Sequence, residues 1–107
     1  MSDLLQEVKV NAILLLKTNG VSLTKASKTI IEDHLTQKFA RRQLLYSLKS
    51  ELSKNVFEAR IKEEKVFDQL LINLLQIAAK ATVQKIIDGF NNILDATVSK
   101  VLGITIV

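Results

Sequence analysis

Residues 66–88 read VFDQLLINLLQIAAKATVQKIID, and this stretch decides the fold class. Its large apolar residues recur at steps of three and four, which is the spacing of one face of an α-helix. The chain contains no proline, and no glycine lies between Gly20 and Gly89, so breakers are absent from most of it. We therefore predict an all-α fold: an irregular bundle of about four to five helices, with long helices in the second half, in one domain over residues 1–107.

Capping residues place the first two helices. Ser2 or Asp3 can cap a helix over residues 3–18, and Thr18-Asn19-Gly20 is a typical helix end. Ser22 or Thr24 can then cap a second helix.

The later boundaries are harder to place, because strong breakers are missing. Bends are expected at 36–41 and at 61–65, the second because residues 58–65 are nearly all charged. Gly89 is expected to end or kink the fourth helix. Asn91-Asn92 would then start a last helix, which Gly103 closes.

The apolar excess of the second half predicts a surface that meets other helices. Hydrophobic residues make up 48% of the chain, which is high for a small protein that must cover itself with polar groups. The C-terminal residues 104–107 are also apolar, although chain ends are usually polar. The predicted partner interface comprises Leu70, Leu74, Ile77, Ala81, Ile104, Ile106 and Val107.

Polar residues between 65 and 88 occupy one narrow side of the predicted helix. Two interpretations stay open for its amides, Asn73 and Gln76. They can form the solvent-facing edge of a buried helix, or they can pair across a helical interface and set its register, as a buried amide does in coiled coils.

Charge divides the chain into two parts. Residues 1–65 hold 12 Lys or Arg and 8 Asp or Glu, whereas residues 66–107 hold 3 of each and form a charge-neutral part suited to oligomerisation. The net charge of +4 therefore belongs to the first part, where it is a candidate footprint for phosphate. The candidate nucleic-acid contacts are Lys25, Lys28, Lys38, Arg41, Arg42, Gln43 and Lys49.

The same region resembles a small helix-turn-helix domain at the level of pattern. A helix, the Asn19-Gly20 turn, a capped second helix and a third helix opening at Arg41-Arg42 would follow one another within residues 8–54. The resemblance implies that the third helix enters the major groove of DNA. A solvated basic face remains the alternative interpretation.

The residue inventory gives little support for catalysis or cofactor binding. The one histidine, His34, follows Glu32 and Asp33, but adjacent residues point to different sides of a helix and a third metal ligand is missing. Catalytic and phosphate-loop motifs are absent. We predict no enzyme, no metal, no cofactor and no small-molecule substrate.

A membrane span is not expected either. As a helix, residues 66–88 would extend roughly 34 Å, enough to cross a bilayer. However, Asp68, Lys80 and Lys85 lie within it, and exposing a charge to lipid costs a few kcal/mol. The acidic N-terminus and the absence of cysteine indicate a protein of the cytoplasm, or of a virus particle, that is not secreted.

Two hypotheses about function follow. The first is a non-enzymatic helical subunit that self-associates or docks into a larger assembly, of which a virion is one example. The alternative is a small dimeric DNA-binding protein that binds through residues 17–54.

Overall fold

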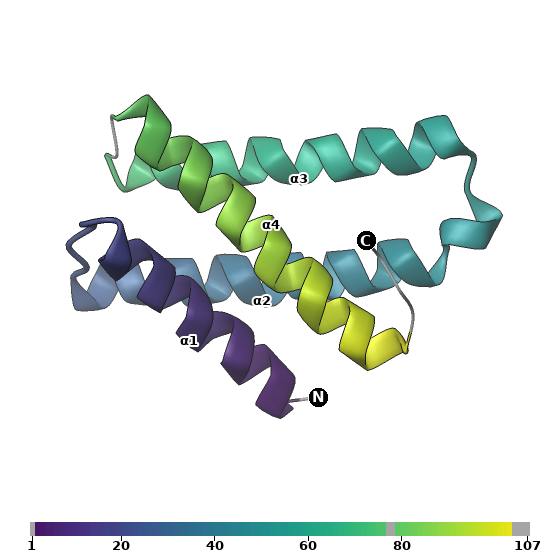
Figure 1. Cartoon of the computed structure of the whole chain (residues 1–107), viewed down its shortest axis with the longest axis horizontal. Helices are drawn as coiled ribbons and strands as arrows, with labels where there is room; N and C mark the ends of the chain where they lie inside the picture. The colour runs from purple at the N-terminus through teal and green to yellow at the C-terminus, as the bar shows by residue number, and fades with distance from the viewer. Residues whose placement is uncertain (1, 77–78, 104–107) are drawn as a thin grey trace.

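The structure of the 107-residue chain is a computed structural model that describes residues 2–76 and 79–103. The helices are α1 (Ser2–Thr18), α2 (Lys25–Ser47), α3 (Lys54–Leu74) and α4 (Lys80–Leu102), with a 3-10 turn, η1 (Lys49–Glu51), between α2 and α3 (Figure 1). No strand occurs in this described part. The predicted all-α bundle is therefore confirmed, with four helices.

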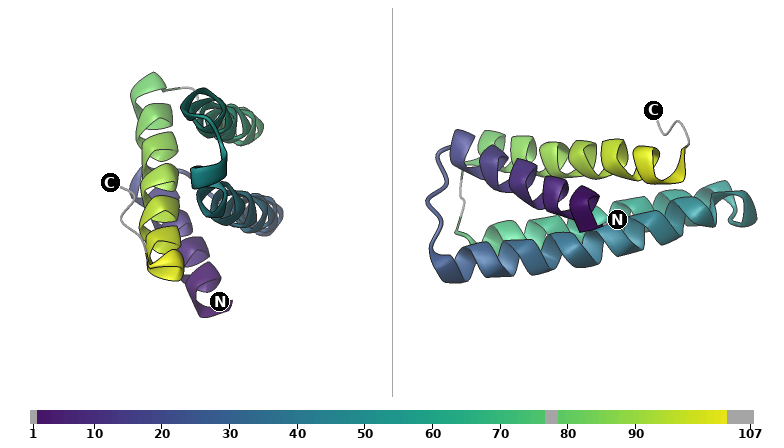
Figure 2. Two further views of the ribbon diagram at one scale, coloured as in Figure 1. Left: turned by 90° about the vertical axis from the view of Figure 1, so that its right-hand side faces the viewer. Right: turned by 90° about the horizontal axis from the view of Figure 1, so that it is seen from below.

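The four helices form two layers (Figure 2). In one layer, α2 and α3 run antiparallel and are joined through η1. In the other, α1 packs against α2 and α4, and α4 crosses both α2 and α3. The α2/α3 layer consequently has an outer face that neither α1 nor α4 covers.

Local side-chain hydrogen bonds start the two hairpin helices. The Thr24 hydroxyl accepts from the Ser27 amide at 3.0 Å, and the Ser53 hydroxyl accepts from the Val56 amide at 3.2 Å. Both are N-caps that satisfy amides with no partner inside the helix. Thr24 was one of the two caps predicted for the second helix.

Two glycines occupy the left-handed conformation that helix ends favour. Gly20 has φ +79° after α1, and Gly103 has φ +63° after α4. Both ends agree with the sequence prediction, because glycine adopts this conformation without steric cost.

The predicted bends at 36–41 and 61–65 are wrong, since both ranges lie inside continuous helices. The chain turns instead around η1, just before the Ser53 cap, and again at the Leu75 end of α3. Charge is not a helix breaker: Arg41 of α2 and Glu64 of α3 pair across the hairpin at 3.1 Å and tie the two helix interiors together.

The predicted helix boundary at Gly89 is also wrong. α4 continues through Gly89 and Asn91 to Leu102. A β-carbon at Gly89 would lie 2.3 Å from Leu15 Cδ2 of α1, so the glycine serves a close approach between two helices and not a helix end.

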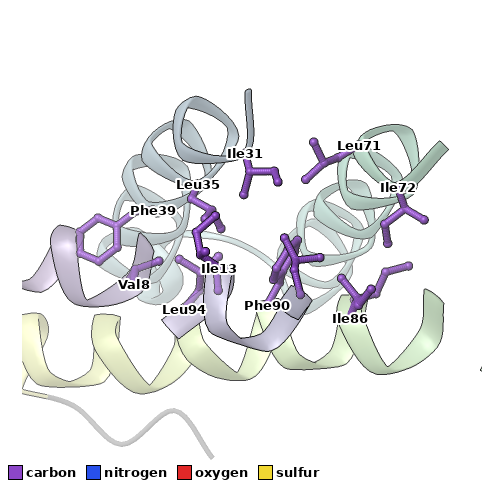
Figure 3. Close-up of a cluster of buried hydrophobic side chains, with 13 residues drawn as sticks. Val8, Ile13, Ile31, Leu35, Phe39, Leu71, Ile72, Ile86, Phe90 and Leu94 are labelled. Carbon is purple, nitrogen blue, oxygen red and sulfur yellow. The ribbon is translucent and has the colours of Figure 1, made fainter. Parts of the chain in front are cut away.

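Apolar side chains from all four helices form one core between the layers. Burial of a large apolar side chain stabilises the fold by about 1.5–3 kcal/mol. Figure 3 shows this cluster: Val8 and Ile13 from α1, Ile31, Leu35 and Phe39 from α2, Leu71 and Ile72 from α3, and Ile86, Phe90 and Leu94 from α4.

Candidate interaction surface

The inner face of α3 carries two acidic residues. Glu64, Asp68, Leu71 and Ile72 are the buried residues of this helix, and Asp68 is completely inaccessible. Burying an ionised carboxylate costs several kcal/mol unless charged and hydrogen-bonding partners compensate. The partners of these two carboxylates therefore decide whether α3 can pack in this orientation.

Asp68 is held by groups from α2 and α4. His34 Nε2 lies 2.9 Å from Asp68 Oδ1, and Lys38 Nζ donates to Oδ2. Asn91 Nδ2 of α4 donates to the same Oδ2 at 3.1 Å. Asp68 is thus the junction at which three helices meet through polar contacts.

Opposing effects act on the pKa values of the buried pair. Burial alone would raise the pKa of Asp68, but the hydrogen bond to His34 and the charge of Lys38 outweigh it, so the pKa lies below its ordinary value. Burial lowers the pKa of Lys38, and the neighbouring charge of Asp68 only partly offsets that effect.

A second set of polar contacts extends from the same junction. Arg42 of α2 donates from Nη1 to Asp95 and from Nη2 to the Asn91 side-chain oxygen at 2.6 Å, although its own side chain is only 1% exposed. Asn91 therefore connects the Asp68 and Arg42 clusters. On the other side of the hairpin, the Arg41 guanidinium pairs with Glu64 and lies 4.8 Å from the Phe67 ring centroid.

Because the polar face of α3 turns inward, its other face is apolar and points to solvent. We call Val66, Phe67, Leu70 and Leu74 the outer α3 stripe; these side chains are 58%, 41%, 60% and 61% exposed. Single exposed apolar residues are common, but four within nine positions of one helix form a patch.

A groove lies between this stripe and α2. Its volume is about 430 Å³, and its apolar lining comes from Ile30 of α2 and from Phe67, Leu70, Leu71 and Leu74 of α3. Ile30 is itself 42% exposed. The stripe and the groove together form one surface with a ridge and an adjoining depression.

The structure brings two of the predicted interface residues together. Leu70 and Leu74 both belong to the outer α3 stripe, and Ala81 is exposed near the start of α4. Ile77, Ile104, Ile106 and Val107 fall outside the described residues.

The two predicted register amides are exposed at the C-terminal end of α3. The Asn73 side-chain oxygen accepts a hydrogen bond from Gln69 at 3.0 Å within the same helix. Gln76 follows the helix with φ +59°. Neither amide is buried within the chain, so a role in register would have to arise between chains.

The predicted nucleic-acid contacts do not share one surface. Lys38 and Arg42 are buried in the ion pairs described above, and α2 runs through Arg41-Arg42 without a break, so the third helix expected to open there does not exist.

The other candidates lie apart. Lys25 and Lys28 are exposed in the first turn of α2, and Gln43 is partly buried near its end. Lys49 is exposed in η1, where its Nζ lies 5.2 Å from the Phe57 ring centroid and 5.9 Å from that of Tyr46.

The described residues contain neither a cluster of metal ligands nor a helix that could span a membrane. In 2–76 and 79–103, no three His, Cys, Asp or Glu side chains converge as a metal site would require. Within the same ranges, every helix is too short or too polar to cross a bilayer.

Sequence reasoning missed Phe67 and Ile30 as surface residues, and it missed the whole Asp68 junction. One signal was available: Glu64 and Asp68 fall in the helical row of Leu71, Ile72 and Leu75, and therefore face away from Val66 and Leu70. The cations that make this face the inner one lie about 30 residues earlier, beyond the reach of local periodicity.

No protein-family model matches the chain, and no curated protein or solved structure matches it either.

Proposed function

We propose that this protein is a non-enzymatic helical interaction subunit that joins an assembly through the outer α3 stripe. One observation carries the proposal: α3 packs two carboxylates inward and leaves Val66, Phe67, Leu70 and Leu74 in water. A helix that served only its own bundle would gain more stability by burying those four side chains. Their exposure is accounted for if a partner covers them.

The free energies support a docking role for a surface of this size. Burying the exposed fractions of the four side chains would contribute roughly 3–6 kcal/mol. Association itself costs about 4 kcal/mol or more. The stripe alone would therefore bind weakly, and Ile30, which lines the adjoining groove and is 42% exposed, supplies further apolar contact.

The polar face of α3 supports the same role. Because ion pairs and hydrogen bonds from His34, Lys38 and Asn91 hold Asp68, the orientation of α3 is fixed from the inside. A fixed orientation keeps the stripe presented to a partner without any rearrangement, which lowers the cost of binding.

Photocross-linking tests the proposal whatever the partner is. A photoreactive residue at position 70 should give a discrete cross-linked product of defined mass in the cells that make the protein. The matched control is position 14, because Leu14 of α1 is equally exposed at 60%. Equal, diffuse cross-linking from both positions would contradict the proposal.

Light scattering on a size-exclusion column gives a second readout. The double variant Leu70→Glu/Leu74→Glu should elute with a lower molar mass than the wild type, or should no longer form the complex. The control Val10→Glu/Leu14→Glu should behave like the wild type, although Val10 and Leu14 are also exposed, on α1. Adding a random DNA duplex at low salt tests the alternative function. A shift of the wild-type protein onto the duplex would move the functional surface to the basic N-terminal part.

A further inference from the structure

We infer that the partner of the outer α3 stripe is a second copy of this chain, with the two α3 helices antiparallel and the two Leu70 residues at the twofold axis. The inference rests on the proposed function, since it names the partner for the same surface. Three features of the surface support it.

The first feature is the symmetry of the stripe along the helix. Val66 and Leu74 lie four residues before and after Leu70, and all three are apolar and about 60% exposed. In a twofold interface the same patch is used on both sides, so residue i must fit residue j while j fits i. An antiparallel pair centred on Leu70 places Val66 against Leu74 at both ends and Leu70 against itself.

The second feature is the placement of charge, which selects the antiparallel orientation. Lys62 and Glu63 lie one turn before the stripe, whereas Asn73 and Gln76 lie at its other end. Parallel helices would bring the two charged ends together and set each exposed Lys62 near the other Lys62, which repels. Antiparallel helices centred on Leu70 instead separate the two Lys62 residues by about 24 Å along the helices.

The charges around the stripe also make an oppositely charged partner unnecessary. Arg60 pairs with Glu63 at 2.9 Å, and Arg41 pairs with Glu64 at 3.1 Å. Both of these arginines therefore have an acidic partner within one chain. An apolar, self-complementary patch whose neighbouring arginines are already paired fits a copy of itself better than it fits a strongly acidic protein.

The third feature is the groove next to the stripe. Paired helices pack by inserting side chains of one helix into depressions on the other. Here the ridge formed by Leu70 and Leu74 and the depression of about 430 Å³ beside it lie on the same face of one chain. Each copy can therefore supply both the inserting side chains and the space that receives them.

Cysteine cross-linking tests the orientation, because the chain has no cysteine of its own. In the proposed pair the two Leu70 residues face each other. The two Val66 residues are about 12 Å apart along the helices, beyond the Cα separation of roughly 4.4–6.8 Å that a disulfide allows. Leu70→Cys should therefore form a disulfide dimer on mild oxidation, and Val66→Cys or Leu74→Cys alone should form little. An equal mixture of Val66→Cys and Leu74→Cys should form the mixed dimer.

Leu14→Cys on α1 measures random collision, because Leu14 is as exposed as Leu70. Leu70→Cys should exceed this control by at least about fivefold, since a disulfide needs close and sustained contact. Circular dichroism and unfolding curves check that each variant is folded, and all four sites are on the surface.

The outcomes separate this inference from the proposed function. If Val66→Cys dimerises as readily as Leu70→Cys, the helices are parallel and the inference is overturned. Suppose instead that every cysteine variant gives no more disulfide dimer than Leu14→Cys, while position 70 photocross-links to a different protein. That result overturns the inference that the partner is a second copy, and the proposed docking role of the stripe survives. If no cysteine variant exceeds Leu14→Cys and position 70 also photocross-links no better than position 14, both the proposed function and the inference about a second copy are overturned.

Discussion

Lys38 of α2 donates a hydrogen bond to Asp68 of α3 although both side chains have no solvent exposure. This ion pair crosses the hairpin at the point where His34 and Asn91 also reach Asp68. It explains why α3 turns its carboxylates inward, and therefore why its apolar stripe faces outward.

Removing the Asp68 carboxylate should destabilise the fold strongly. Asp68→Ala leaves the Lys38 ammonium buried without a counter-ion, so we expect the free energy of unfolding in denaturant to fall by about 3–5 kcal/mol. Asp88→Ala is the matched control, because Asp88 is exposed on α4 and its carboxylate accepts a hydrogen bond from Gln84 of the same helix. A loss below about 1 kcal/mol for Asp68→Ala would show that the pair does not hold the hairpin.

Replacing both charges with apolar residues should cost much less than removing one. In Lys38→Met/Asp68→Leu no buried charge is left unpaired at this point, and such replacements are often neutral or stabilising. His34 loses its partner, but Asn91 still donates to the Ile87 carbonyl at 2.8 Å and accepts from Arg42. Denaturant unfolding should give a double variant more stable than Asp68→Ala alone. Simple addition of the two single losses would contradict this expectation.

Acid should weaken the fold through Asp68. Its pKa in the folded chain lies below the ordinary value of 3.8, so the folded state binds this proton less readily than the unfolded chain does. The resulting stability is present above pH 3.8 and is lost as the pH falls through the lower, folded value. Unfolding free energies measured from pH 7 to pH 2 should fall more steeply for the wild type than for Asp68→Asn. Identical slopes would place the acid sensitivity elsewhere.

Gly89 should show an energetic coupling to Leu15. Alanine favours a helix over glycine by about 1 kcal/mol, but a β-carbon at position 89 would lie 2.3 Å from Leu15 Cδ2. Gly89→Ala should therefore raise the free energy of unfolding of the Leu15→Ala variant. In the wild type, the same substitution should raise the free energy of unfolding by less, or lower it. Thermal or denaturant unfolding of the four proteins should give a coupling of about 0.5 kcal/mol or more. Its absence would mean that Leu15 moves aside at no cost.

Local patterns predicted the all-α class and several helix ends. The Thr24 cap, the Gly20 end and the Gly103 end all follow from short-range chemistry that is visible in the sequence. The bends predicted at 36–41 and 61–65 lie inside continuous helices, and the second was predicted only from its charge, although Glu64 there pairs with Arg41 across the hairpin. Gly89 was misread for a related reason, since its role is set by Leu15 of a different helix.

The sequence by itself determined that the chain is helical, and it determined that α3 has two faces, one with Val66, Leu70 and Leu74 and one with Glu64, Asp68 and Leu71. Only the tertiary structure decided which face is buried. The rule that apolar faces pack inward would bury the face with Val66, Leu70 and Leu74. Lys38 and Arg41, placed opposite α3 by the hairpin, reverse the choice, because a buried carboxylate is tolerated where cations and hydrogen-bond donors converge on it.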